Sequence, residues 1–338
     1  MRRYITPWRV VAAIALLFVV TVLILLRIPS DQYILLPDIA HPVAPLVKVA
    51  GARTPNGSGA IYFLDVIERH ASELEALFPW IHPDGTLVPA GDILPPCSTA
   101  AQAEQAQLQE MAFSQRVAAT VALRRLGYHV GVRPTGVVVS QLIGGTNAPC
   151  NLQPMDVVIS VDGTPTPTEA ALHAALGRVT PGAVVKLRVR RGGKLLTVPI
   201  RTVADHGRAL VGFVPDQSAS FKLPFRVSID AGNVGGPSAG LAFALEVMQQ
   251  LGRNVTHGHR VAATGQMLLN GTVAPIGGVR QKVVDAHKAN VEALLVPAGS
   301  NAREARRYAP KDLRVIPVRT FNQALRALAT LPPAGSNS

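Results

Sequence analysis

The sequence predicts an α+β protein in three parts: an N-terminal transmembrane helix, a β-rich middle domain and a C-terminal α/β domain. Three observations lead to this prediction. Residues 10–26 carry no charge, residues 130–203 form short alternating strands, and strands alternate with helices from about residue 207 onward. A polarity period of two is typical of half-buried strands, and alternation of strands with helices is typical of an α/β domain.

The composition indicates folded globular domains. The 338 residues are 48% hydrophobic and 16% charged, which suffices for two or three cores and excludes a disordered chain. The formal charge is +12, but the chain contains no long block of consecutive basic residues, and aromatic residues make up only 5%. We therefore expect no nucleic-acid partner and interpret the excess of arginine as a basic surface near anionic lipid.

The N-terminus predicts a retained membrane anchor. Arginine-containing residues 1–9 precede the uncharged run Val10–Leu26, so we expect a membrane-spanning helix over 10–27. Tyr4 and Trp8 lie at the interface end, where amphipathic aromatic residues are favoured. The arginines predict a single-pass protein of the cytoplasmic membrane, with its N-terminus inside and the rest of the chain outside. The alternative is a cleaved signal peptide, but the segment that follows offers no small-x-small cleavage site.

The segment 28–129 is rich in proline and glycine and contains three patterned stretches. The apolar run 61–66 predicts a strand, and "ASELEALF" after it predicts a short helix. Residues 103–127 predict a longer helix that ends at Gly127. Its inward-facing residues are expected to be Met111, Val117, Val121 and Leu123.

The chain has two cysteines, Cys97 and Cys150, and both fall in the part expected outside the cytoplasm. An oxidising compartment permits one disulfide between them, which would join the segment before the middle domain to a loop inside it. The alternative is that both are unpaired small hydrophobic residues. The sequence leaves both interpretations open.

Residues 130–205 form the predicted β-rich domain. Its strands are "GVVVSQL", "MDVVISVDG", "AVVKLRVRR" and "KLLTVPIRTV", and its helix is "TEAALHAALGRV". In this order they resemble a PDZ domain of the bacterial protease type, with Met155-Asp156 where a glycine-aspartate pair is usual. The resemblance implies that an extended peptide adds to a sheet edge. The alternative is a PDZ fold that serves only as a spacer or a dimer contact.

Residues 207–330 are expected to form the α/β domain, and residues 331–338 a disordered tail. Within the domain, Ser238 stands in "GNVGGPSAGLAF" at the start of a helix with one apolar face. Three interpretations are open for this serine: a helix cap, a nucleophile beside an oxyanion site, or one side of a phosphate-binding turn. Neither G-x-x-x-x-G-K-[ST] nor H-E-x-x-H occurs in the chain.

Helix geometry supplies Lys282 as a partner for this serine. At about 100° per residue from Val279, Lys282 shares the face of Val283 and Ala286, whereas Lys288 lies on the opposite side. Burial of a lysine side chain favours the neutral form of its amine, and a neutral amine can accept a proton from serine. The alternative is that Lys282 extends to solvent or pairs with a carboxylate.

Two stretches together carry a family resemblance. "GGPSAGLAFALEV" and "HGHRVAATGQMLLNGTVAPIGGVRQKVVDAHKANVEALLVPAGSNAREA" resemble the proteolytic domain of Lon-type serine-lysine peptidases, a ribosomal-S5-like α/β fold. The resemblance implies that Ser238 is the nucleophile, Lys282 the general base and Thr264 the residue that holds the lysine amine. It also implies that Gly236 and Pro237 shape the turn that presents the serine.

The whole chain is similar to one branch of this family, the membrane-anchored Lon-like proteins of actinobacteria and Bacillus-type bacteria that carry an extracytoplasmic PDZ domain. It departs from the usual Lon pattern in three ways. No Walker motif or ATPase module is present, Gln266 stands in place of an acid, and Asn233-Val234-Gly235 stands in place of a lysine-aspartate pair. The catalytic pair is intact, and ATP-driven unfolding is not implied.

These observations predict an ATP-independent serine endopeptidase outside the cytoplasmic membrane, with a PDZ domain that docks unfolded or flexible polypeptides. We expect no cofactor and no metal. The expected partners are polypeptide substrates and the cytoplasmic membrane, with a hexameric homo-oligomeric ring implied by the resemblance. Two alternatives are a catalytically silent PDZ scaffold that retains the Lon fold, and an anion or nucleotide site at the glycine-rich turn.

Overall fold

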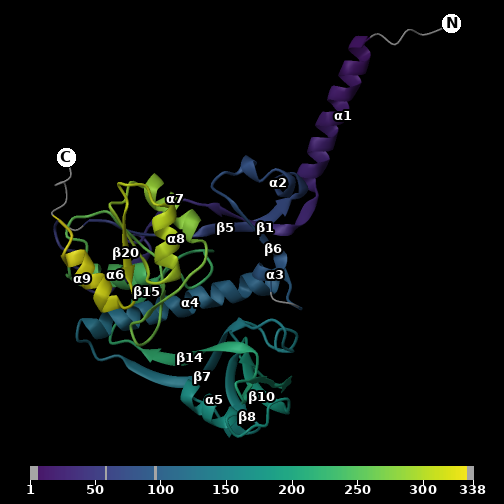
Figure 1. Ribbon diagram of the computed structural model, residues 1–338. Helices are drawn as coiled ribbons and strands as arrows, with labels where there is room; N and C mark the ends of the chain where they lie inside the picture. The colour runs from purple at the N-terminus through teal and green to yellow at the C-terminus, as the bar shows by residue number, and fades with distance from the viewer. Residues whose placement is uncertain (1–6, 58, 95–96, 333–338) are drawn as a thin grey trace.

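The computed structural model describes residues 7–57, 59–94 and 97–332 (Figure 1). Most of the expected cytoplasmic segment 1–9, including Tyr4, lies outside the described residues, as does most of the expected tail 331–338. The predicted fold class is confirmed: an apolar N-terminal helix, a β-rich domain and a C-terminal α/β domain follow one another along the chain.

Helix α1 (Pro7–Arg27) projects from the body of the molecule (Figure 1). This helix is 21 residues long and apolar, and none of its residues is buried. It is therefore long and apolar enough to cross a membrane. Only Ile28 separates it from strand β1 (Pro29–Pro37). This strand is the centre of a three-stranded antiparallel sheet, between β5 (Val66–Ser72) and β6 (Thr86–Pro89).

The run expected as a single strand over 61–66 is divided between two sheets, which corrects that expectation. Strand β4 (Ile61–Phe63) belongs to the C-terminal domain, and β5 begins only at Val66, because the chain crosses between the two sheets at Leu64 and Asp65. The expected short helix follows β5 as α2 (Glu73–Leu77), whose start is fixed by a capping box of Ser72 and Glu75. Two further short elements are η1 (Pro79–Ile81) and α3 (Ala90–Ile93).

The C-terminal domain is built on a five-stranded sheet. Its order is β2 (His41–Pro42), β4, β16 (Val261–Ala263), β19 (Ala293–Pro297) and β20 (Arg314–Val318). The pairing of β2 is antiparallel and the other pairings are parallel. Strands β2 and β4 come from the segment expected at 28–129, so strand pairing crosses that expected boundary. Strands β16 and β19 are buried throughout, as is usual for parallel strands covered on both faces.

Helices cover both faces of this sheet. Helix α6 (Gly240–Gln250), all of whose residues are buried, and α9 (Phe321–Ala329) share one core, and α7 (Val279–Lys288) and α8 (Ser300–Tyr308) share the other. Alternate residues of β16 point into the two cores. Two small antiparallel pairs complete the domain: β3 (Val47–Val49) with β15 (Val227–Ile229), and β17 (Gln266–Met267) with β18 (Val273–Ala274).

The β-rich domain contains a sheet in the order β11, β10, β8, β7, β14, with β9 paired to β8. The bounds are β7 (Gly131–Leu142), β8 (Val157–Val161), β9 (Thr164–Pro165), β10 (Val184–Arg191), β11 (Lys194–Arg201) and β14 (Phe213–Lys222). Helix α5 (Glu169–Leu176) packs against the core of this domain. Strand β14 falls within the range 207–330 that was expected for the C-terminal domain, yet it pairs with β7 of the β-rich domain. Strand pairing therefore crosses the expected boundary between these two domains. The hairpin β12 (Val203–Asp205) with β13 (Arg208–Leu210) connects β11 to β14.

Helix α4 (Ala100–Arg125) runs between the two domains (Figure 1). It begins three residues earlier than the predicted range 103–127, because Thr99 and Gln102 form a capping box. It ends two residues earlier than predicted, at Arg125. Its four residues predicted to face inward are all buried, three of them in the core that contains α6.

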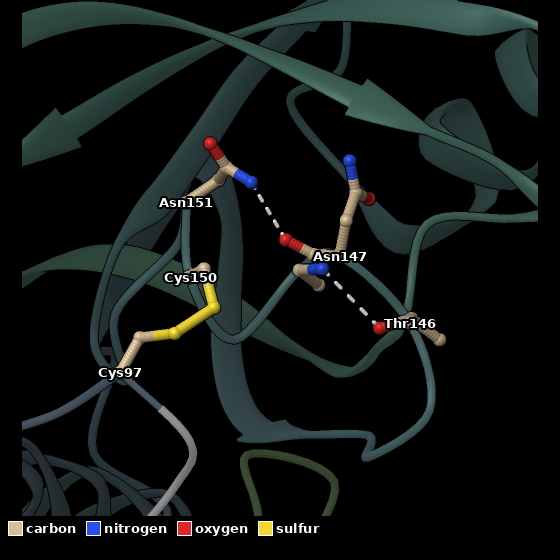
Figure 2. Close-up of a disulfide and its surroundings, with 6 residues drawn as sticks. Cys97, Thr146, Asn147, Cys150 and Asn151 are labelled. Carbon is tan, nitrogen blue, oxygen red and sulfur yellow. Dashed lines mark hydrogen bonds between the residues drawn. A yellow bond between two sulfur atoms is a disulfide. The ribbon is translucent and has the colours of Figure 1, made fainter.

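A disulfide fastens the start of α4 to the β-rich domain. Cys97, three residues before α4, is bonded to Cys150 in the loop between β7 and β8 (Figure 2). The same loop is held by a hydrogen bond of 2.7 Å from the side-chain amide of Asn151 to the carbonyl of Asn147 (Figure 2). The disulfide therefore fixes one end of α4 against the middle domain.

Candidate active site

The turn that presents Ser238 is held in place by helix α4. Gly236 has a φ of +78°, a conformation that favours glycine, and its amide donates to the carbonyl of Gln107 at 2.8 Å. The hydroxyl of Ser114 donates to the carbonyl of Pro237 at 3.0 Å. Both contacts come from α4, so a helix distant in sequence positions the serine.

Glycine is also required at the first residue of α6. A Cβ added at Gly240 would lie 2.8 Å from the hydroxyl oxygen of Ser114 and 3.0 Å from the backbone nitrogen of Met267. The backbone of α6 can therefore approach both α4 and β17 closely. Ser238 lies two residues before α6 but does not cap it: the residue at the cap position is Ala239, which makes no side-chain cap hydrogen bond.

Lys282 reaches this serine from α7. Its Nζ lies 2.7 Å from Oγ of Ser238 and 3.5 Å from Oγ1 of Thr264. The side chain of Lys282 is buried, whereas that of Lys288 is 61% exposed, so the face predicted from helix phase is the one observed. The structure thus brings together the three side chains that the sequence singled out for catalysis.

Thr264 also contacts the backbone of the turn formed by Gly236, Pro237, Ser238 and Ala239, called the nucleophile turn below after the role that the sequence predicts for Ser238. Its hydroxyl donates to the carbonyl of Ser238 at 3.3 Å, and the amide of Gly265 donates to the same carbonyl at 2.7 Å. These two contacts fix the carbonyl of Ser238 and leave its side chain facing Lys282. Ser238 itself is half-buried, which leaves a side for a substrate to approach.

Burial lowers the pKa of Lys282 to about 8, because the charged amine loses its hydration. The negative charges of Asp65 and Asp285 act in the opposite direction and raise this pKa. Burial in turn raises the pKa of Asp65 above its usual range and that of Asp285 to about 7. An amine with this pKa is partly neutral near pH 8 and can accept a proton.

The sequence did not single out these two carboxylates. Asp285 lies one helical turn after Lys282, so its spacing of three residues was a usable signal. Asp65 lies in the crossing between β4 and β5, far earlier in the chain, and no local pattern connects it with Lys282. Ser114 and Gln107 were missed for the same reason.

Asp65 belongs to a small polar cluster behind the lysine. Nε2 of His41 lies 3.2 Å from a carboxylate oxygen of Asp38 and 3.4 Å from one of Asp65. These side chains offer donor atoms within 4.8 Å of one another, which is close enough to share a metal ion. Nε2 of His41 makes a hydrogen bond with Asp38, whereas the Asp65 oxygen nearest His41 has no hydrogen-bond partner among the described residues.

Two of the backbone amides at the turn are free to bind an oxyanion. The amide of Gly240 donates to the carbonyl of Pro237, and that of Leu241 donates to the carbonyl of Gly265. Within the part of the chain that the structure describes, the amides of Ser238 and Ala239 make no hydrogen bond. They lie at the positive end of α6, where negative charge is favoured.

A cavity of about 460 Å³ adjoins the nucleophile turn. Its walls are Pro237 and Met267 of the C-terminal domain, Ser114 of α4, and Val138 and Val214 of the β-rich sheet. A neighbouring cavity of about 740 Å³ shares part of its lining, so the space continues between α4 and the β-rich domain.

Comparison with known protein families identifies two domains. Residues 216–330 match the Lon protease (S16) C-terminal proteolytic domain, and residues 121–202 match the PDZ domain. The chain therefore carries a Lon-type proteolytic domain and a PDZ domain, in the order that the sequence motifs predicted. The predicted family resemblance is confirmed at this level.

Individual relatives resemble the proteolytic domain. Lon protease 1 of Sorangium cellulosum is 35% identical over 109 residues, which are 29% of this chain and 13% of that protein. Lon protease of Vibrio parahaemolyticus is 33% identical over 102 residues, which are 30% of this chain and 13% of that protein. The chain thus matches only about an eighth of the length of these relatives. Among solved structures, the PDZ domain of an SdrC-like protein from Listeria monocytogenes covers 24% of this chain and 87% of its own, with 22% identity and a TM-score of 0.23.

Proposed function

We propose that this protein is an ATP-independent serine endopeptidase that uses Ser238 and Lys282 as a catalytic dyad. The observation that carries the proposal is the 2.7 Å separation between Nζ of Lys282 and Oγ of Ser238, in a buried setting that lowers the pKa of the lysine. The matched Lon-type domain supports it.

The geometry suits acyl transfer. The neutral amine of Lys282 accepts the hydroxyl proton of Ser238 while Oγ attacks the scissile carbonyl carbon. The amides of Ser238 and Ala239 stabilise the oxyanion, and the protonated lysine then donates its proton to the leaving amine. Water hydrolyses the acyl ester by the reverse path, which restores the free serine.

The proposal also includes the membrane and the PDZ domain. Helix α1 anchors the chain with its N-terminus in the cytoplasm, and the disulfide between Cys97 and Cys150 suits an oxidising compartment outside. The PDZ domain docks an extended segment of an unfolded or flexible polypeptide. Assembly into a hexameric ring remains a prediction from family resemblance.

The test uses the full chain, purified in detergent, with an unstructured polypeptide and no ATP. We expect cleavage by the unaltered protein and its loss in Ser238→Ala, Lys282→Ala and Lys282→Arg, since arginine keeps the charge but cannot act as a base. The controls are Ser228→Ala and Lys288→Ala, because both residues are exposed. Equal cleavage by Ser238→Ala would refute Ser238 as the nucleophile, and a lack of cleavage by the unaltered protein would leave the silent PDZ scaffold as the better account.

A further inference from the structure

The cavity beside the nucleophile turn lies where a substrate side chain would enter. Pro237, the neighbour of Ser238, lines this cavity, and so do Val138 and Val214 of the PDZ sheet. Helix α4 contributes Phe113 and Ser114 to the lining. This space therefore lies between the PDZ sheet and the turn that carries Ser238.

Two carboxylates give the cavity a negative charge. Glu110 of α4 and Asp216 of β14 are the only charged side chains among its described lining residues. Neither forms an ion pair with any residue that the structure describes. The carboxylate of Asp216 accepts one hydrogen bond, from the amide of Gln217 at 2.7 Å. Arg191, which lines the neighbouring cavity, is already paired with Asp156 at 2.6 Å and does not supply a cation.

The two acids come from different elements and converge on the same space. Asp216 is directly opposite Val138 across the pairing of β14 with β7, and both line the cavity rather than the core of the PDZ domain. Glu110 precedes Ser114 by one helical turn on α4, so it faces the cavity beside the residue that holds the nucleophile turn. The charge is therefore concentrated next to the reacting serine.

We propose that this cavity is a specificity pocket that accepts a lysine or arginine side chain of the substrate, so that the protein cleaves close to a basic residue. This inference rests on the proposed peptidase function. A volume of about 460 Å³ lies within the range of ~300–1,000 Å³ typical of ligand pockets, so a long side chain fits. Phe113 and Met267 contact its aliphatic stem, and the two carboxylates bind its charged end.

Electrostatics supports the same assignment. Loss of hydration raises the pKa of Glu110 to about 7 and that of Asp216 to about 6, and the nearby negative charge of Glu169 adds to the rise at Asp216. A bound ammonium or guanidinium group supplies the missing partner and lowers both pKa values. An acidic substrate side chain, by contrast, meets like charge once these carboxyl groups are ionised, above about pH 7, and is rejected.

The test compares fluorogenic peptides that differ at one position, with lysine, arginine, glutamine, norleucine or glutamate placed in turn at each site around the scissile bond. At one of these sites we expect kcat/KM to be roughly tenfold higher for lysine or arginine than for glutamine. A ratio of this size corresponds to the free energy of one charge-assisted hydrogen bond. This ratio should fall toward one in Glu110→Gln and Asp216→Asn. It should persist in Glu104→Gln, which removes an exposed charge from the same helix. Equal rates for lysine and glutamine at every site in the unaltered protein would overturn the inference.

A binding measurement separates this inference from the peptidase proposal. Ser238→Ala cannot form the acyl ester but keeps the cavity, so fluorescence anisotropy on this variant reports the pocket alone. We expect lysine-containing peptides to bind roughly tenfold more tightly than their glutamine counterparts, and the difference to vanish when Glu110→Gln is added. Equal affinities would refute the pocket, whereas cleavage that survives Ser238→Ala would refute the dyad and leave the binding result standing.

Discussion

The hydroxyl of Ser114 lies 3.0 Å from the carbonyl oxygen of Pro237, one residue before Ser238. Ser114 belongs to α4, which lies outside the matched range 216–330 of the proteolytic domain. The geometry of the nucleophile turn thus depends on a helix contributed by a different part of the chain.

Replacement of this serine tests that dependence. In Ser114→Ala the turn loses one hydrogen bond, so we expect kcat to fall several-fold while KM changes little. The free energy of unfolding should fall by about 1 kcal/mol, the usual contribution of one hydrogen bond. Steady-state kinetics and thermal unfolding measure both, with Ser228→Ala as the matched control. A kcat equal to that of the control would show that the contact does not position Ser238.

The rate should depend on pH through Lys282. Because the neutral amine is the active form and its pKa is lowered to about 8, kcat/KM should rise by about tenfold per pH unit below pH 8 and level off above it. The measurement is a pH profile with an uncharged peptide substrate. A profile that is flat between pH 6 and pH 9 would contradict lysine as the base.

The charge of Asp65 should set the pH at which the activity rises. This negative charge raises the pKa of Lys282, so removing it in Asp65→Asn lowers this pKa and shifts the rise in activity to lower pH. Asp31→Asn is the control, since Asp31 is exposed on β1. A shift in the opposite direction, or an equal shift in the control, would refute electrostatic coupling between Asp65 and Lys282.

The disulfide should contribute to stability. Cys97 and Cys150 are separated by 53 residues, and closing a loop of this length stabilises a fold by about 4 kcal/mol on the chain-entropy estimate. We expect reduction, or replacement of both cysteines by serine, to lower the melting temperature. Thermal unfolding with and without a reductant measures the effect, and the double variant should not respond to the reductant. A reductant-induced shift that persists in the double variant would exclude the disulfide as its cause.

Much of the candidate site could be predicted from local patterns. The phase of α7 places Lys282 on the buried face, and the glycine-rich turn followed by an apolar helix places Ser238 at the start of α6. These predictions depend on neighbours within a few residues, which the helix period of 3.6 relates directly.

The remaining features depend on pairings between distant segments. Strand β4 joins the sheet of the C-terminal domain beside β16, and β14 joins the PDZ sheet beside β7. Neither partner can be identified from the pattern of either strand alone, since a buried strand has the same pattern in any sheet. For the same reason no local pattern indicates that Asp65, in the crossing between β4 and β5, acts on Lys282.

Gln107, Glu110 and Ser114 occupy successive turns on one side of α4, where Gln107 and Ser114 hold the nucleophile turn and Glu110 lines the cavity. If the proposed dyad and pocket are correct, a substitution that repositions this side of the helix alters side-chain selection and turnover together. Selectivity in this protein is therefore difficult to evolve by changes in α4 alone. The PDZ wall of the cavity, at Val138 and Val214, is where preference can change while the rate is preserved.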